Sequence, residues 1–343
     1  MFYQCPKCRR RWEYPLNECP YDFAPLAIMK SATAKVASSA KVSIATLLHP
    51  APPYYVLLLK DENDNFWVHK SEKEFKLGEE FQTESIPADN AVAIWRVKYN
   101  PKEAISKVLE LIGGLKVNAD SKIFILPTIT ASSYEYFRDN TSPRFLDAVL
   151  SLLVERGVKT ANITVGTQSF DEVPLSVAAQ KSGLLALAGK YKIMPQDLAE
   201  AEYTKMGQFE IVKSASEADL IINLAMEKMG QASSAQNMFR LLKKQNYLGL
   251  QYLSSDEEIA KKLEKIFNKM IVIGEAENVQ RSCKLTTFLG LVLAAKNPCY
   301  LDRVFNEAAQ ALKLPEIIKN CNMESIAVVG RSIREVQYQA EIY

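Results

Sequence analysis

Four side chains near the start of the chain have the types and the spacing of a metal site. Cys5 and Cys8 are separated by two residues, and Cys19 and Asp22 repeat that spacing further along, with a proline after the first ligand of each pair. Zinc accepts both thiolate sulfur and carboxylate oxygen, and four such ligands close a tetrahedral structural site. The sequence therefore predicts a structural zinc ion held by Cys5, Cys8, Cys19 and Asp22, with no position left open for catalysis.

The alternative for this segment is a metal-free ribbon held together by aromatic packing alone. That packing would depend on Trp12, Tyr14, Tyr21 and Phe23. So short a segment buries little apolar surface by itself, and this favours the metal. We expect the ion to serve folding.

Composition limits the remaining possibilities. The chain has 343 residues, more than one hydrophobic core usually supports, and its net charge is only +2. It shows neither an apolar run long enough for a membrane span nor the apolar region of a secretory signal at its start, so we expect a cytoplasmic protein without a membrane partner. Residues 1–41 carry a local excess of basic residues, seven against three acidic ones.

The pattern along the chain predicts three parts. A zinc ribbon covers 1–26. A linker and a small antiparallel, OB-like β domain cover 27–88, in which the Ser/Ala/Lys segment 31–41 is the linker or a short helix. In 89–343, apolar strands alternate with amphipathic helices, which predicts an α/β domain with a mostly parallel sheet covered by helices on both faces.

Two loops of the large domain carry candidate ligand-binding residues. Thr167, Gln168 and Ser169 follow one predicted strand and precede a helix, which is an arrangement suited to an anion. Lys228 and Asn237 belong to a polar segment after another strand. The alternatives are an ordinary helix cap for the first loop and a flexible solvated loop for the second.

The first quarter of the chain resembles DUF family 35. The resemblance rests on the Cys/Asp ribbon followed by HPAPPYYVLLLKDENDNFWVHK and KLGEEF. It implies a binding or bridging module that accompanies acyl-CoA enzymes, and therefore a protein partner. Ribbon and OB modules also bind nucleic acid, and Arg9–Arg11 with Trp12 and Trp67 are the residues that would do so here.

Residues 91–343 resemble DUF family 362, an α/β family often fused to iron–sulfur modules. The segments that carry this resemblance are VAIWRVKYNPKEAISKVLELIGG, KIFILPTIT, TSPRFLDAVLSLLVERGVKTANITVG, ADLIINLAMEK, AQNMF, NPCYLDRVF and IAVVG. Lys228, Asn237 and Asp302 match polar positions of the family pattern. The chain departs from that pattern at Leu126, Thr128, Gly230, Gln236 and Asn297.

These departures remove an imidazole and other polar groups from the matching site, which lowers its capacity for acid–base work. Glu275 and Glu277 are the remaining acids near Lys228. The chain has no ferredoxin-type cysteine run. Its two histidines, His49 and His69, fit strand positions better than ligand positions.

Three hypotheses follow. The first is a non-enzymatic, zinc-stabilised binding or scaffold protein whose front module docks a protein partner and whose α/β crevice binds an anionic small molecule. The second is an enzyme of unknown reaction that uses Lys228 and Asp302 as working groups. The third is a nucleic-acid-binding protein that uses the basic ribbon and the OB-like module.

Overall fold

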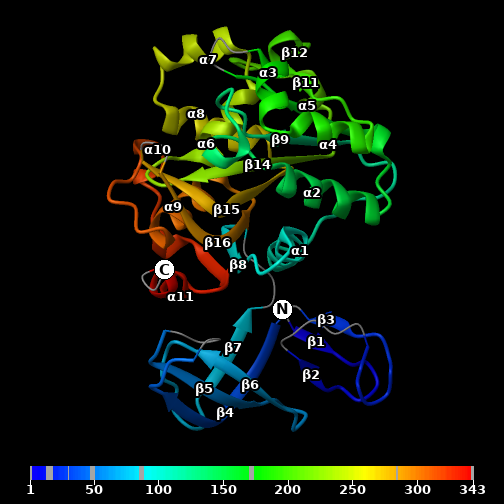
Figure 1. Ribbon diagram of the computed structural model, residues 1–343. Helices are drawn as coiled ribbons and strands as arrows, with labels where there is room; N and C mark the ends of the chain where they lie inside the picture. Colours follow the sequence, from blue (N-terminus) through cyan, green and yellow to red (C-terminus); the bar gives the residue numbers. More distant parts are fainter. Residues whose placement is uncertain are drawn as a thin grey trace. The chain divides into compact units, whose positions relative to one another are not determined.

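The computed structural model describes residues 2–12, 18–29, 31–46, 51–84, 89–169, 174–282 and 285–340. His49 lies outside these ranges. The chain divides into two compact units, Met1–Pro87 and Ala88–Ala340. Each unit is described by itself below (Figure 1).

The small unit contains two antiparallel sheets. The first has three short strands in the order β2-β1-β3, and the second has four strands in the order β6-β5-β4-β7. The strands of the first sheet are β1 (Phe2–Gln4), β2 (Arg11–Trp12) and β3 (Ala27–Met29). Those of the second are β4 (Ser31–Val42), β5 (Tyr54–Lys60), β6 (Phe66–Ser71) and β7 (Glu80–Glu84).

The Ser/Ala/Lys segment is neither a linker nor a helix, and this expectation was wrong. It forms β4, which pairs with both β5 and β7. Ala34 and Val36, two positions apart, are buried in a core that also contains Leu57, Leu59 and Trp67. The period of two places both side chains on one face of the strand. The segment is a strand although Ser, Ala and Lys are not residues that favour strands.

The large unit is built on one eight-stranded sheet in the order β11-β10-β9-β14-β15-β16-β8-β17. In chain order the strands are β8 (Ala91–Arg96), β9 (Ile123–Pro127), β10 (Ile163–Thr167), β11 (Gln196–Asp197), β14 (Leu220–Lys228), β15 (Met270–Ser282), β16 (Leu285–Ala295) and β17 (Ala327–Gly330). A separate hairpin consists of β12 (Tyr203–Met206) and β13 (Phe209–Val212).

This sheet is mixed: among the described residues five of its strand pairings are parallel and two are antiparallel, and the expectation of a mostly parallel sheet did not include the antiparallel pair. Strand β16 runs antiparallel to both of its neighbours, β15 and β8. Because β15 ends at Ser282 and β16 begins at Leu285, the connection is far too short for the crossover that parallel neighbours require. The sequence predicted two apolar strands where β15 and β16 lie, but it did not predict that they form one long hairpin.

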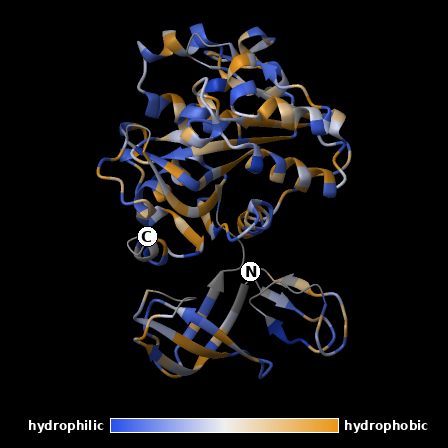
Figure 2. Cartoon of the chain, in the orientation of Figure 1, coloured by the Kyte–Doolittle hydropathy of each residue, from blue (hydrophilic) through white to orange (hydrophobic). Residues whose placement is uncertain are grey.

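Helices cover both faces of the sheet, as expected, and Figure 2 shows hydrophilic and hydrophobic residues alternating around them. One face carries α1 (Pro101–Leu111), α2 (Pro143–Glu155), α3 (Leu175–Lys181) and α4 (Leu184–Tyr191). The other carries α5 (Lys213–Ser216), α6 (Ser233–Met238), α7 (Lys244–Gln251), α8 (Asp256–Ile266), α9 (Pro298–Ala308), α10 (Glu316–Lys319) and α11 (Ile333–Ala340).

Several helices begin with the signals that the sequence displays. Helices α1, α2 and α9 each start with a proline that follows a capping Asn or Ser. The cap side chain accepts a hydrogen bond from a backbone N–H that the first turn leaves without a partner, and proline needs no such partner. Helix α8 begins with a capping box formed by Ser255 and Glu258.

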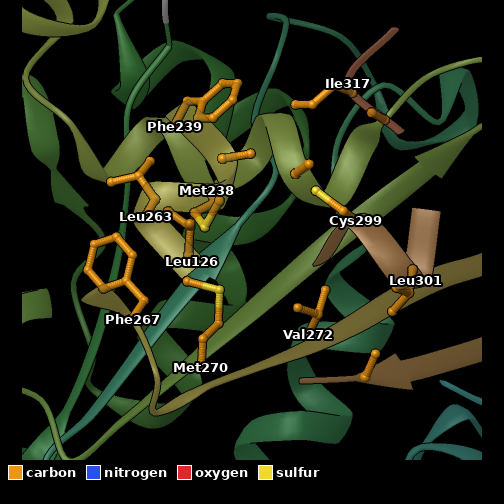
Figure 3. Packing of buried hydrophobic residues seen from close by; sticks show 14 of the residues in the cluster. Leu126, Met238, Phe239, Leu263, Phe267, Met270, Val272, Cys299, Leu301 and Ile317 are labelled. Atoms are coloured by element: carbon orange, nitrogen blue, oxygen red, sulfur yellow. The ribbon is translucent and has the colours of Figure 1, made fainter. Parts of the chain in front are cut away.

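Two hydrophobic cores lie on opposite faces of the sheet. Along β9, Ile123 and Ile125 belong to one core, whereas Phe124 and Leu126 belong to the other. Figure 3 shows part of the second core, in which Leu126 lies near Met238, and Phe239 and Leu263 belong to the same cluster. None of the helices in the described ranges is long and apolar enough to cross a membrane.

The order of the strands creates a switch point between β9 and β14. From β9 the chain passes through α2 to β10 on one side, and from β14 it passes through α6, α7 and α8 to β15 on the other side. Since α2 and α6 pack on opposite faces, the two connections diverge at the carboxyl ends of these strands. Ligands of open α/β sheets usually bind at such a point.

Candidate functional site

The predicted metal ligands converge in the small unit. One ligand atom from each of Cys5, Cys8, Cys19 and Asp22 lies within 4.8 Å of the others. The Cys5 sulfur is 3.2 Å from both carboxylate oxygens of Asp22, and the sulfurs of Cys8 and Cys19 are 3.6 Å apart. Tetrahedral zinc with bonds to sulfur of about 2.3 Å places two sulfurs about 3.8 Å apart. The cluster could therefore hold a metal ion.

The two halves of the cluster have the same backbone structure. The N–H of Arg9 donates to the carbonyl of Cys5 and that of Phe23 to the carbonyl of Cys19, each at 2.9 Å. Arg9 and Phe23 both adopt the left-handed conformation, with φ of 59° and 53°. Asp22 thus occupies in the second turn the position that Cys8 occupies in the first.

The aromatic alternative for this segment finds little support among the described residues. Tyr21 and Phe23 are 66% and 74% exposed, so they bury little surface. Tyr14 lies outside the described ranges. The local core consists of Cys5, Cys19 and Ala24, with Cys8, Trp12 and Leu26 packed against it. A core of this size needs a further constraint to be stable.

The basic run beside the cluster is partly occupied. The Nε of Arg11 is 3.2 Å from the carboxylate of Asp61, and both side chains are buried. The guanidinium of Arg10 stacks on the ring of Tyr21 at 3.5 Å. Trp67 is buried in the core of the four-stranded sheet. Arg11 and Trp67 are therefore not exposed for phosphates or bases.

A polar pocket lies at the switch point of the large unit. It is partly open to solvent and lies between the ends of β9 and β14 and the segment that begins with α6, with ≈ 280 Å³ of space when the open solvent at its mouth is included. Its lining is hydroxyl, amide and cationic, with one methionine: Thr128, Thr130, Met226, Lys228, Gln231, Ser233, Gln236, Asn237 and Arg240.

Lys228 is the last residue of β14, and its side chain is buried against polar groups. Its ammonium nitrogen is 3.3 Å from the hydroxyl of Thr130 and 3.8 Å from the carboxylate of Asp139. Asp139 also accepts a hydrogen bond of 3.2 Å from Gln280. Burial lowers the pKa of Lys228, Asp139 opposes that change, and Arg240 adds to it.

Arg240 and Gln168 hold each other by reciprocal contacts. The guanidinium of Arg240 donates to the carbonyl of Gln168, and the side-chain amide of Gln168 donates to the carbonyls of Arg240 and Leu242, both at 2.6 Å. Gln168 and Thr167 are buried, whereas Ser169 is half-buried. Thr167, Gln168 and Ser169, at the end of β10, were expected to bind a ligand. Gln168 instead donates to the backbone of Arg240 and so helps to position that residue.

Asn237 is buried in the wall of the pocket. Its amide nitrogen donates to the carbonyl of Leu126 and to the side-chain oxygen of Asn223, at 3.0 and 2.7 Å. Asn237 thereby ties α6 to β9 and β14. Lys228 and Asn237, predicted from one polar segment, do line the same pocket.

Asp302 has a different environment from the one expected. Its two carboxylate oxygens accept the backbone N–H groups of Ser234 and Ala235, at 2.9 and 2.8 Å, so it caps α6 from α9. The hydroxyl of Ser234 donates to Glu227 at 2.6 Å. Burial raises the pKa of Asp302 to about 7, and burial together with the Asp302 charge raises that of Glu227.

The other titratable candidates also have partners. Glu275 is buried, and its carboxylate accepts the N–H of Ser142 at the start of α2 at 2.8 Å. Burial raises the pKa of Glu275 to about 7. Glu277 pairs with Arg144 at 3.2 Å. His69 is half-buried in β6, with its ring 4.6 Å from that of Phe81, as a strand residue would be.

Comparison with known families covers the region of this pocket. A family model described as "Domain of unknown function (DUF362)" matches residues 123–307, more than half of the chain. The chain belongs to this family. No curated protein matches the chain. The match spans β9 to α9 and includes Thr128, Lys228 and Asp302, whereas the small unit lies outside it, so the resemblance to DUF family 35 stays a prediction.

Four of the eight positions singled out through the DUF362 resemblance meet in space. Thr128, Lys228, Gln236 and Asn237 line the pocket, although they come from two segments far apart in the sequence. Asp139 and Arg240 were missed. Arg240 follows Asn237 closely and its charge could have drawn attention, whereas Asp139 sits in the loop after β9 and carries no signal of its own.

Proposed function

We propose that this is a non-enzymatic, zinc-stabilised binding protein whose pocket at the switch point holds a small anionic molecule and whose small unit docks a protein partner. The observation that carries the anion is the lining of the pocket. Lys228 and Arg240 both face it, and none of its described lining residues is acidic. With Asp139 beside Lys228, the balance of one positive charge suits a small carboxylate or a phosphate monoester.

The zinc proposal is supported by the geometry and chemistry of the donor set. Three sulfurs and one carboxylate within 4.8 Å of one another suit zinc better than magnesium or calcium, which prefer oxygen ligands. Cys5, Cys8, Cys19 and Asp22 would hold the ion, whose role is to fix the two turns. Metal analysis of the purified protein should find about one zinc per chain; a persistently lower value removes this part of the proposal.

Docking of a protein partner is supported by the edge strand β6. Phe66 and Val68 alternate on one face of this strand and are 53% and 62% exposed. An exposed apolar edge strand is an unusual feature unless another surface covers it. Within this proposal the four-stranded sheet would act as an OB-like module.

The test of the anion site is direct binding of small anions. Calorimetric titration with glycolate, phosphate and acetate should give at least one saturable interaction, weakened at least about tenfold in Lys228→Met, because a hydrogen bond to a charged group contributes roughly 1.5–3 kcal/mol. Lys243→Met is the matched control, since Lys243 pairs with Glu210 and does not line the pocket. Absence of binding for the whole panel, or equal binding by both variants, contradicts the proposal.

The enzyme hypothesis keeps one specific observation in its favour. The pKa of Lys228 is lowered by burial, and lysines with that property act as bases or nucleophiles. Asp302 gives less support, because both its oxygens cap α6. The nucleic-acid hypothesis has lost two of its supporting side chains, Arg11 and Trp67, to buried contacts. Salt-dependent retention on nucleic acid would revive it.

A further inference from the structure

A primary amine, that of Lys228, and a guanidinium, that of Arg240, line the same pocket. Lys228 is 8% exposed, and its nitrogen lies 3.3 Å from a hydroxyl and 3.8 Å from a carboxylate. Charge-assisted hydrogen bonds of an ammonium are usually about 2.7–2.9 Å long. Both contacts are therefore weak for a buried cation, so the ammonium of Lys228 gives up a proton more readily than that of a surface lysine.

The other groups of the pocket suit an anion rather than an apolar ligand. Arg240 presents a planar set of donors, and the side-chain amide of Gln168 fixes the backbone around it by hydrogen bonds to the carbonyls of Arg240 and Leu242. Ser233, Gln236 and Thr128 add hydroxyl and amide groups around the same space. Lys228 and Arg240 line the same small pocket, and the charge of Arg240 acts on Lys228. A ligand of a few non-hydrogen atoms that meets both side chains therefore carries its anionic group near the atom that meets the amine.

We propose that Lys228 binds a small 2-oxo acid covalently, as an imine, with the carboxylate of the ligand held by Arg240. This inference rests on the proposed function of the pocket as an anion site. It names the class of ligand, a carbonyl compound that carries a carboxylate beside the carbonyl carbon, and it assigns to Lys228 a chemical role that an anion site alone does not need.

The reaction balances without an oxidant or a reductant. The lone pair of the Lys228 nitrogen forms a bond to the carbonyl carbon, and the carbonyl π pair moves to its oxygen, which takes the proton that the nitrogen loses. This carbinolamine then loses the same oxygen as water. The water carries away the second proton of the nitrogen, and the nitrogen lone pair forms the C=N bond. Asp139, 3.8 Å from the nitrogen, is placed to hold a proton between the two steps.

The experiment compares glyoxylate with glycolate, which has the same carboxylate but no carbonyl group. The full chain is incubated with glyoxylate and cyanoborohydride, which reduces an imine to a stable amine, and peptide mass spectrometry locates the product. We expect modification at Lys228 that saturates with glyoxylate concentration, is suppressed by glycolate, and is at least about tenfold faster than at surface lysines, because the ligand is held beside the amine.

Three variants give the controls. Lys228→Arg should keep glycolate binding and lose the saturable adduct, which shows that the site still folds. Arg240→Met should slow the modification of Lys228 at low glyoxylate by at least about tenfold, because an anchor for the carboxylate is gone. Lys243→Met should leave both binding and modification of Lys228 unchanged, because Lys243 does not line the pocket.

The outcomes separate this inference from the proposal on which it rests. If both acids bind but glyoxylate modifies Lys228 no faster than surface lysines, without saturation, the imine is wrong and the anion site stands. If neither acid nor any other small anion binds, both fail. A saturable adduct that persists in Lys228→Arg, carried by another lysine, also overturns the assignment.

Discussion

The metal cluster and the pocket are assembled in opposite ways. All four ligands of the cluster lie between Cys5 and Asp22, in two turns with identical backbone hydrogen bonds. The pocket draws Thr128 and Thr130 from the loop after β9 and its other lining residues from 226–240, with Asp139 reaching Lys228 from further along that loop. A site of the first kind is written into local spacing, whereas a site of the second kind exists only once the sheet has formed.

The two regions also differ in what holds them together. Around the cluster, the buried apolar set among the described residues is Cys5, Cys19 and Ala24. The pocket stands on a sheet with an extensive hydrophobic core on each face. Removing one polar or ionic contact should therefore have a large effect in the small unit and a small one in the large unit.

The largest expected effect is the loss of the proposed zinc ion. Replacing Cys19 with Ser should abolish stoichiometric zinc and unfold the segment around residues 5–24, because structural zinc contributes roughly 10–16 kcal/mol of apparent binding free energy to such small domains. Hydrogen exchange should show lost protection in the small unit only. Cys321→Ser, at a half-buried cysteine outside the cluster, is the matched control. If Cys19→Ser keeps its zinc content and its protection from hydrogen exchange, the small unit does not depend on the metal ligands as proposed.

The cluster was predictable, and the reason is its independence from the rest of the fold. The spacing of Cys5, Cys8, Cys19 and Asp22 was enough to predict that they form one cluster, and the four side chains do lie close together. Strand β4 was not predictable by composition, because Ser, Ala and Lys conceal the alternate burial of Ala34 and other positions. Its identity as a strand depends on partners, β5 and β7, that lie further along the chain.

The pocket was predictable only in part, for the same physical reason. Lys228 and Asn237 lie in one polar segment and could be picked out, whereas Asp139 becomes relevant only because the loop after β9 returns to β14. Asp302 was expected to be a working group in the enzyme hypothesis. It caps α6 instead, and no local pattern reveals a hydrogen bond between residues so far apart in sequence.

The next effect in size concerns the buried ion pair of Arg11 with Asp61. In Arg11→Met, Asp61 would remain buried without its cation, and the free energy of unfolding of the small unit should fall by about 3–5 kcal/mol. Chemical denaturation followed by hydrogen exchange of the small unit measures this change. Arg10→Met is the control, because Arg10 lies exposed on the ring of Tyr21. Equal effects of the two variants would show that Asp61 does not depend on Arg11.

A smaller and pH-dependent effect is expected at the carboxyl pair of Glu227 and Asp302. Both folded-state pKa values are raised, that of Asp302 to about 7. The folded chain thus holds protons that the unfolded chain has already lost, and stability declines as pH rises from about 4 to about 7. Glu227→Gln removes one acid while keeping an acceptor for Ser234. It should stabilise the large unit at pH 8 by on the order of 1–3 kcal/mol and change little at pH 4.

Thermal unfolding of Glu227→Gln across this pH range checks the prediction. Glu103→Gln is the matched control on α1, where the side chain is exposed, and it should follow the parent protein at every pH. If the curves for Glu227→Gln and the parent chain run parallel, the two carboxyl groups do not share their titration in the folded protein.

The smallest expected effect is at Asn297, which caps α9 in the large unit. Its side-chain oxygen accepts the N–H of Tyr300 and its amide donates to Glu264, both at 3.0 Å. Asn297→Ala should cost about 1 kcal/mol, as the loss of a helix cap usually does, and Asn297→Ser should restore most of it because serine caps equally well. Denaturant titration measures both variants. If Asn297→Ala lowers the free energy of unfolding as much as Arg11→Met does, the large unit depends on single polar contacts as strongly as the small unit. The two apolar cores of the large unit would then contribute less stability than their extent implies.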